Sequence, residues 1–261
     1  MKRRDTWERV RRVRIGSLWL DALSFDGALA AVEQLLASGT GGALFTPNVD
    51  HIVTAESHAG LRDAYAAADL SVADGQWVVW ASRLLGTPLP EKISGSDLLL
   101  PLARAAGQKG RSIFLLGGAP GIAEEAARRL EKEGALICGL ESPRIDLAEP
   151  QDALVARIAG ARPSLVLVAL GCPKQELWIH RHRARLRPAV LVGIGATLDF
   201  LAGRVRRAPP WVSRTGLEWA FRLALEPRRL ARRYLVNDPK FLGILLRTLR
   251  ESRVRRMLEK R

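Results

Sequence analysis

Asp74 is the first residue whose type and position could do chemistry. It lies in the tetrad Ala73-Asp74-Gly75-Gln76, directly after the short segment Ser71-Val72. An Asp-Gly pair that follows a strand commonly forms a turn. A loop at the end of a strand can also direct a carboxylate into a cleft, where the carboxylate can remove a proton from a hydroxyl group. Asp74 is therefore our candidate for a general base.

Two further segments place polar side chains next to apolar runs. The hexapeptide Thr46-Pro47-Asn48-Val49-Asp50-His51 puts four polar or ionisable side chains at the end of one run. The hexapeptide Gly171-Cys172-Pro173-Lys174-Gln175-Glu176 follows another and brings an amide and a cation to the same kind of position. Each segment has a structural alternative, a cap-and-turn cluster or a Gly-Pro turn into a helix. Both interpretations remain open at this point.

The sequence lacks the common patterns for metals and cofactors. It contains no Asp-x-Asp pair, with which many nucleotide-sugar enzymes hold Mg²⁺ or Mn²⁺, and its 4 histidines lack a spacing to carboxylates that would indicate zinc. The segment Gly193-Ile194-Gly195-Ala196-Thr197-Leu198 lacks the third glycine of a dinucleotide fingerprint. We expect no metal and no cofactor, so any phosphate must be held by arginines and helix dipoles.

The elements that must position these residues alternate between short apolar runs and amphipathic stretches. We expect strands at 14–19, 43–47, 112–116, 136–138, 165–170 and 189–194. Helices are expected between them, at 25–36, 55–68, 97–106, 122–132 and 150–159. Several strand candidates are continuous apolar runs, which is typical of strands covered on both faces. The alternation predicts an α/β fold with a Rossmann-like, mostly parallel sheet that binds ligands at the carboxyl ends of its strands.

The pattern changes near Arg204. After Pro209 and Pro210 no strand signal follows; residues 211–225 predict a helix, Pro227 interrupts or restarts it, and residues 239–260 predict a basic amphipathic helix. We therefore expect an α/β body at residues 1–203, followed at residues 204–261 by a helical, basic appendage that associates with a membrane.

The distribution of charge supports this division. The chain of 261 residues has a net charge of +14, and residues 204–261 hold 17 Lys and Arg against 5 Asp and Glu. Residues 15–203 hold 17 Lys and Arg against 20 Asp and Glu. Such an asymmetry indicates a polyanionic partner, which could be a nucleic acid, a phosphorylated ligand or an anionic membrane.

The composition excludes several classes of protein. With 48% hydrophobic and 26% charged residues, the chain is typical of a globular protein rather than a disordered one. The longest stretch without charge, residues 34–49, is shorter than a membrane-spanning helix. Only 2 cysteines are present, which argues against a disulfide framework. We expect a cytoplasmic protein, peripheral on the inner face of the membrane.

Several segments carry a resemblance when they are taken in order. They are Phe45-Thr46-Pro47-Asn48, Ala73-Asp74-Gly75, Ile93-Ser94-Gly95-Ser96-Asp97-Leu98, Leu115-Leu116-Gly117-Gly118, Gly171-Cys172-Pro173-Lys174-Gln175-Glu176, Gly193-Ile194-Gly195, Arg207-Ala208-Pro209 and Gly216-Leu217-Glu218-Trp219. The chain resembles the WecG/TagA/CpsF family of bacterial glycosyltransferases, from about residue 14 to about residue 234. Each motif is weak alone, but their shared order makes a chance match improbable.

The resemblance implies a reaction. A hexose of the N-acetylmannosamine type would pass from UDP to a polyprenyl-diphosphate-linked sugar such as GlcNAc, with inversion and without a metal, in the synthesis of cell-surface polysaccharide or teichoic acid. The resemblance also implies roles for particular residues: Asp74 as general base, and Thr46, Asn48, Gln175, Arg222, Arg229 and Arg232 as substrate-binding residues. Where the family usually has an arginine, this chain has Lys92, which keeps the charge but loses the two-pronged guanidinium.

A second class of function is a nucleic-acid-binding protein with a Rossmann-like body and a basic arm. Against it, the tail interleaves arginine with leucine and isoleucine, and the last thirty residues (232–261) offer only Tyr234 and Phe241 for stacking on bases. We therefore expect a UDP-sugar, a lipid-linked acceptor and an anionic membrane surface as partners, and no nucleic acid. The sequence leaves open the donor hexose, the acceptor polymer and a homo-oligomeric state.

Overall fold

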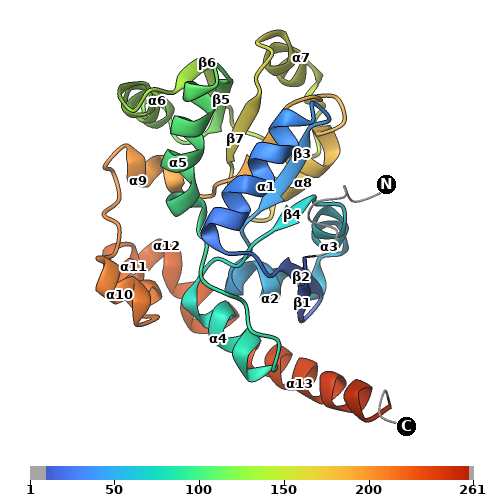
Figure 1. Ribbon diagram of the computed structural model, residues 1–261. Coiled ribbons are helices and arrows are strands. Elements are labelled where there is room, and N and C mark those ends of the chain that lie inside the picture. Colours follow the sequence, from blue (N-terminus) through green and yellow to red (C-terminus); the bar gives the residue numbers. More distant parts are fainter. Residues whose placement is uncertain (1–9, 259–261) are drawn as a thin grey trace.

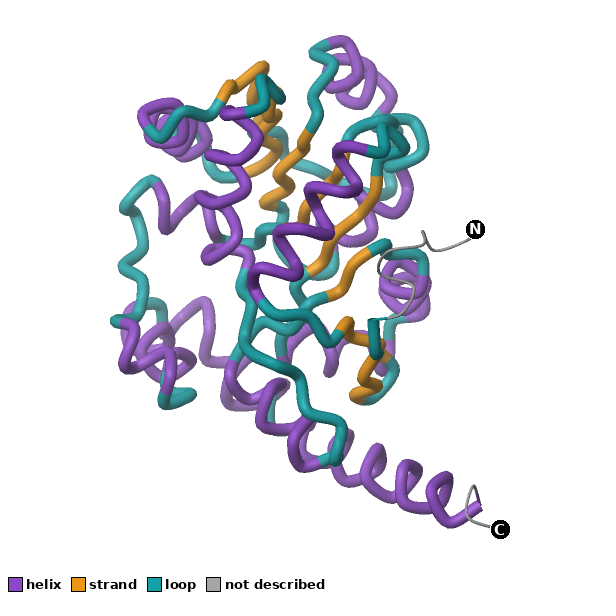
Figure 2. Tube along the Cα trace, in the orientation of Figure 1, coloured by secondary structure: helices purple, strands orange, loops and turns teal. Residues whose placement is uncertain are grey.

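The computed structural model describes residues 10–258. Within this range, 6 strands form an all-parallel sheet in the order β4-β3-β8-β7-β5-β6. The strands are β3 (Gly42–Phe45), β4 (Leu70–Ser71), β5 (Ser112–Gly117), β6 (Leu136–Glu141), β7 (Leu165–Ala169) and β8 (Val190–Gly193). Figures 1 and 2 show this sheet in the middle of the body, with helices on both sides. The predicted α/β fold with a Rossmann-like parallel sheet is confirmed.

Helices cover both faces of the sheet because its central strands are apolar on both faces. All four residues of β8 are buried, and so are the first four residues of β7. On one face lie α1 (Phe25–Ala37), α5 (Gly95–Gln108), α6 (Ile122–Lys132) and α9 (Thr197–Leu201). On the other face lie α2 (Val49–Ser57), α3 (Ala59–Ala66), α7 (Asp152–Gly160) and α8 (Lys174–His182).

The single strand predicted at 14–19 is wrong. The segment forms an antiparallel hairpin of β1 (Arg12–Ile15) and β2 (Leu18–Asp21), separate from the main sheet. Gly16 makes the tight turn possible, since its φ of 59° is one that residues with a side chain rarely adopt. The hairpin is tied to β4 by the carboxylate of Asp21, which accepts a hydrogen bond from the Ser71 N–H at 2.8 Å.

Two predicted helices are also divided. Residues 55–68 belong to α2 and α3, which meet at His58; this residue is extended, and its imidazole Nδ1 accepts from the Leu61 N–H at 3.1 Å. Residues 211–225 form α10 (Pro210–Arg214) and α11 (Glu218–Leu225). Between α10 and α11, Gly216 has a φ of 71°. Helix α4 (Gln76–Leu84) had no counterpart among the predicted elements.

The chain ends in α12 (Pro227–Arg232), the π-helical turn η1 (Arg233–Asn237) and α13 (Lys240–Leu258). Helix α13 extends away from the body at the lower right of Figure 1. Its buried residues Phe241, Ile244 and Leu245 belong to the core that includes the hairpin and α2, so one apolar side of α13 faces the protein itself. Within the described residues, no helix combines the length and the apolar character that crossing a membrane requires.

Candidate active site

A cavity of about 290 Å³ lies where the parallel strands end. The segments after β3, β4, β7 and β8 contribute Thr46, Asn48, Asp74, Cys172 and Gly195 to its wall. The N-terminus of α5 and part of the appendage complete the lining. We call this space the sheet-edge cavity. Its position agrees with the expectation that α/β folds bind ligands at the carboxyl ends of their strands.

Two amide side chains hold the loops of this cavity in place. Asn48 caps α2, since its Oδ1 accepts hydrogen bonds from the backbone N–H groups of Asp50 and His51 at 3.1 and 3.4 Å. Gln175 is buried, and its Oε1 accepts from the Gly195 N–H at 3.0 Å. The first turn of α8 is thereby fixed to the loop after β8.

Asp74 follows β4 and is fixed by its backbone, since its N–H donates to the Pro47 carbonyl at 2.9 Å. Burial and, to a smaller extent, the negative charge of Glu218 on α11 raise the pKa of its carboxyl group from 3.8 to about 6. A carboxylate with a pKa of about 6 is mostly ionised at neutral pH and is a stronger base than an ordinary aspartate. This combination suits a general base.

A second cavity, of about 500 Å³, lies between α4, η1 and the beginning of α13. We call it the appendage cavity. Its wall is rich in aromatic and aliphatic side chains: Trp77, Trp219, Tyr234, Leu235, Phe241 and Leu242. The two cavities have a common wall, formed by Asn48, Asp74, Glu218, Arg222 and Arg233. Asp74 therefore lies where a ligand in one cavity would meet a ligand in the other.

Two of the three predicted appendage arginines line the sheet-edge cavity. Arg222 lies with its guanidinium 5.4 Å from the centre of the Phe200 ring. Its buried Nε has no hydrogen-bond partner among the described residues, so this N–H is available to donate a hydrogen bond to a bound anion. Arg229 is more exposed and pairs with Glu226 at 2.6 Å.

Arg232 lines neither cavity, whereas Arg233 lines both. The Arg233 guanidinium donates to Asn48 Oδ1 at 3.1 Å and lies 3.4 Å from a carboxylate oxygen of Asp50. Sequence reasoning missed this residue. The spacing carried no signal, because residues 232 and 233, three and four positions after Arg229, both share a side of a helix with it.

Lys92 lines neither cavity. Its ammonium group donates to Ser213 Oγ at 2.7 Å and lies 3.5 Å from Glu218 Oε2. Both partners belong to the appendage, so Lys92 links the body to the appendage next to the cavities. Its charge also lowers the pKa of Asp74, against the larger effects of burial and Glu218.

The geometry thus brings together Thr46, Asn48, Asp74, Gln175, Arg222 and Arg229 in one lining. Comparison with known proteins identifies a family and related proteins. Residues 13–255 match the family described as "Glycosyl transferase WecG/TagA/CpsF family". Over 189 residues the chain is 35% identical to an N-acetylglucosaminyldiphosphoundecaprenol N-acetyl-beta-D-mannosaminyltransferase of Bacillus spizizenii, and the match covers 72% of each protein.

Proposed function

Because this chain belongs to the WecG/TagA/CpsF family of glycosyl transferases, we propose that it moves a hexose of the N-acetylmannosamine type from UDP to a polyprenyl-diphosphate-linked, GlcNAc-like acceptor. The name of the Bacillus spizizenii relative supports the sugar and the acceptor. The observation that carries the proposal is the position of Asp74 in the common wall of the two cavities.

The UDP-sugar occupies the sheet-edge cavity in this proposal. The N-terminus of the 14-residue helix α5 reaches this cavity through Ser94, Gly95 and Ser96, and helix N-termini attract phosphate groups. Arg222 and Arg229 bring fixed positive charge to the same lining. Together these groups stabilise the negative charge that develops on the departing UDP, a task that a metal ion performs in other enzymes.

The acceptor occupies the appendage cavity. The aromatic and aliphatic wall suits the first units of a polyprenyl chain, and Arg222 and Arg233 in the common wall suit its diphosphate. Asp74 takes the proton of the acceptor hydroxyl as the hydroxyl oxygen bonds to the anomeric carbon and the bond from that carbon to UDP breaks. One displacement of this kind inverts the configuration at the anomeric carbon.

Contact with an anionic membrane surface is part of the same proposal. Leu242 and Leu246 on α13 and Trp211 on α10 are 61%, 57% and 68% exposed. The basic residues Arg250 and Arg253 are exposed on α13 as well. Each Lys or Arg near an anionic leaflet contributes about 1 kcal/mol of attraction. We therefore propose that residues 204–261 act as the membrane-associating unit, on the cytoplasmic face, and residues 1–203 as the catalytic body.

The nucleic-acid alternative loses support from the positions of two aromatic residues. Phe241 is buried in the core, and Tyr234 packs edge-on against Trp219 with ring centres 6.1 Å apart. Tyr234 and Phe241 are the two aromatic residues of positions 232–261, and both are engaged by the protein.

A UDP-release assay tests the proposal. The donors are UDP-N-acetylmannosamine, its uronic acid and UDP-glucose, and the acceptor is a short-chain lipid-diphosphate-GlcNAc. We expect release that requires the acceptor and strongly prefers one donor. Flotation of the intact chain with anionic and with neutral vesicles tests the membrane contact in parallel. Absence of release with every donor, together with salt-dependent retention on DNA, would overturn the proposal in favour of nucleic-acid binding.

A further inference from the structure

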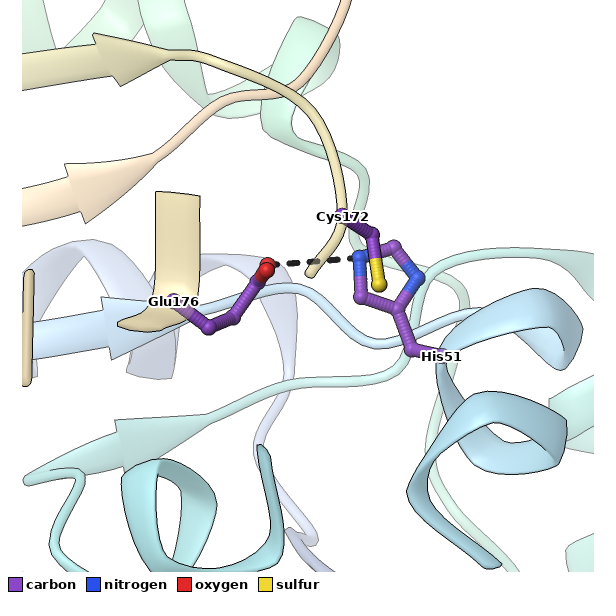
Figure 3. Close-up of side chains that lie close together, drawn as sticks. All are labelled: His51, Cys172 and Glu176. Carbon is purple, nitrogen blue, oxygen red and sulfur yellow. Dashed lines mark ion pairs between the residues drawn. The ribbon is translucent and has the colours of Figure 1, made fainter. Parts of the chain in front are cut away.

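Three side chains with metal-binding chemistry converge at one edge of the sheet-edge cavity (Figure 3). His51 comes from α2, Cys172 from the loop after β7, and Glu176 from α8. The His51 Nε2 lies 3.3 Å from Glu176 Oε1, and the three potential ligand atoms lie within 4.8 Å of one another. In the part of the chain that the structure describes, this is the one group of its kind.

Hydrogen bonds determine which nitrogen of His51 faces the other two side chains. Asn48 Oδ1 accepts from the Asp50 N–H and from the Arg233 guanidinium, so it acts as an acceptor. The His51 Nδ1 lies 2.8 Å from that oxygen and 3.4 Å from the backbone nitrogen of Asn48, so the shorter of its two contacts assigns a proton to Nδ1, which donates to Asn48 Oδ1. Nε2 is left facing Glu176 and Cys172. A histidine that ligates a metal usually has this arrangement, with its other ring N–H held by an oxygen.

The carboxylate of Glu176 supplies an independent observation. Its side chain is 0% exposed, and its Oε2 has no hydrogen-bond partner among the described residues. A buried carboxylate oxygen without a donor costs free energy unless a proton or a cation occupies it. His51 is also nearly buried, whereas Cys172 lines the cavity and gives an ion a path from solvent.

We propose that His51, Cys172 and Glu176 bind Zn²⁺ or a similar thiophilic divalent cation, and that the bound ion inhibits the enzyme. One imidazole nitrogen, one thiolate and one carboxylate are a donor set for zinc, whereas Mg²⁺ and Ca²⁺ take oxygen ligands. Water from the cavity completes the fourth position. Because the thiolate is the form that ligates a metal, the Cys172 thiol releases its proton to solvent when the ion binds.

Inhibition follows from what the ion displaces. Glu176 Oε1 accepts a hydrogen bond from Gln175 Nε2 at 2.7 Å, and a cation that draws Glu176 toward Cys172 breaks this contact. Gln175 and Cys172 both line the cavity assigned to the UDP-sugar, so the ion and its water occupy part of that space. Inhibition rests on the proposed function, whereas the binding of the ion does not.

Calorimetric titration of the full chain with Zn²⁺, after treatment with a chelator and its removal, tests the site. We expect one ion per chain and a measured heat that differs between buffers of different ionisation enthalpy, which shows that protons are released on binding. Co²⁺ serves as a spectroscopic probe, because thiolate ligation gives a charge-transfer band that a hydrogen-bonded cluster does not. Cys172→Ser should abolish the band and weaken Zn²⁺ binding at least tenfold, and Glu176→Gln should also weaken it.

Matched controls use the chain's other residues of the same types. Cys138→Ser and the exposed His180→Asn should bind both ions as the unaltered chain does, whereas His51→Asn should bind them weakly. Circular dichroism establishes that each variant is folded. Absence of a thiolate band in the folded, unaltered chain would overturn the site, and so would equal loss of binding in Cys138→Ser and Cys172→Ser.

Turnover then tests inhibition. Zn²⁺ should lower UDP release by the unaltered chain and by Cys138→Ser, and EDTA should restore it. Bound Zn²⁺ with unchanged turnover would overturn the inhibitory role. Absence of UDP release with every donor would overturn the proposed function instead, while the Zn²⁺ and Co²⁺ titrations would still decide the metal site.

Discussion

Asp74→Asn should reduce turnover and at the same time stabilise the fold. The substitution keeps the shape of the side chain but removes its charge and its ability to accept a proton. Loss of a general base typically lowers kcat by about 10²- to 10⁴-fold. UDP binding should persist, because the groups assigned to the diphosphate are on α5 and on the appendage.

The gain in stability follows from the raised pKa of Asp74. A carboxyl group whose pKa rises from 3.8 to about 6 on folding destabilises the folded state when it is ionised. At pH 7 a shift of about 2 units corresponds to at most about 3 kcal/mol in the free energy of unfolding. Screening by solvent in the cavity reduces this figure, so we expect a gain of about 1 to 2 kcal/mol and a Tm higher by several degrees.

The sign of the pH dependence provides the sharpest check. The unaltered chain regains this stability as the pH falls from about 6 to about 4, where Asp74 becomes protonated in both states. The difference between Asp74→Asn and the unaltered chain should therefore be largest at pH 7 and vanish near pH 4. Denaturant titrations at both pH values measure it.

Asp63→Asn on α3 is the matched control, because Asp63 is exposed and lines neither cavity. It should leave turnover and stability unchanged. An Asp74→Asn variant that is less stable than the unaltered chain would show that the carboxylate holds the fold together. Turnover within threefold of that of the unaltered chain would refute the role as general base.

Three further predictions concern the reaction. The value of kcat/KM should fall tenfold per pH unit below about pH 6, as Asp74 becomes protonated. Burial also raises the pKa of Asp238 to about 6, so Asp238→Asn is the control. If this fall in kcat/KM at low pH is absent in Asp238→Asn, the titrating group is Asp238. Single replacement of Arg222 or Arg229 by Gln should lower turnover, most strongly at Arg222, where about 2 to 4 kcal/mol or a hundredfold is expected. Arg232→Gln should leave turnover nearly unchanged, because Arg232 lines neither cavity. Unchanged rates in Arg222→Gln and Arg229→Gln would assign leaving-group stabilisation to α5. EDTA should not lower turnover, and loss of activity that Mg²⁺ or Mn²⁺ restores would indicate a required metal.

The pattern of the sequence was sufficient to predict the body and part of the site. Thr46, Asp74 and Gln175 each follow an apolar run, and parallel strands bring such positions to one edge. The hairpin at residues 12–21 was missed because its two strands are short and the turn depends on one glycine, Gly16. Helix α4 was missed as well, since it begins directly after Asp74 and Gly75, in a segment interpreted as a turn.

The appendage was harder to predict, because its residues take their roles from contacts with distant parts of the chain. Lys92 meets Ser213, which is 121 positions away, and Arg233 meets Asn48, which is 185 positions away. The basic helix at the end of the chain was expected to present its apolar side to a membrane. Phe241 and Ile244 instead pack against the body. The apolar periodicity of a helix does not show whether its apolar side packs against the protein or against a membrane.

The common wall between the two cavities has a thermodynamic consequence. Arg222 and Arg233 each face both spaces, so a ligand that orders either guanidinium in one cavity changes the free energy of binding in the other. Coupling of this kind is reciprocal: the factor by which the donor alters the affinity for the acceptor equals the factor by which the acceptor alters the affinity for the donor. In the proposed function both ligands carry a diphosphate, so the donor and the acceptor would compete for the guanidinium groups of Arg222 and Arg233. Under that proposal, departure of UDP would strengthen the binding of the lengthened lipid, and we expect UDP to leave first.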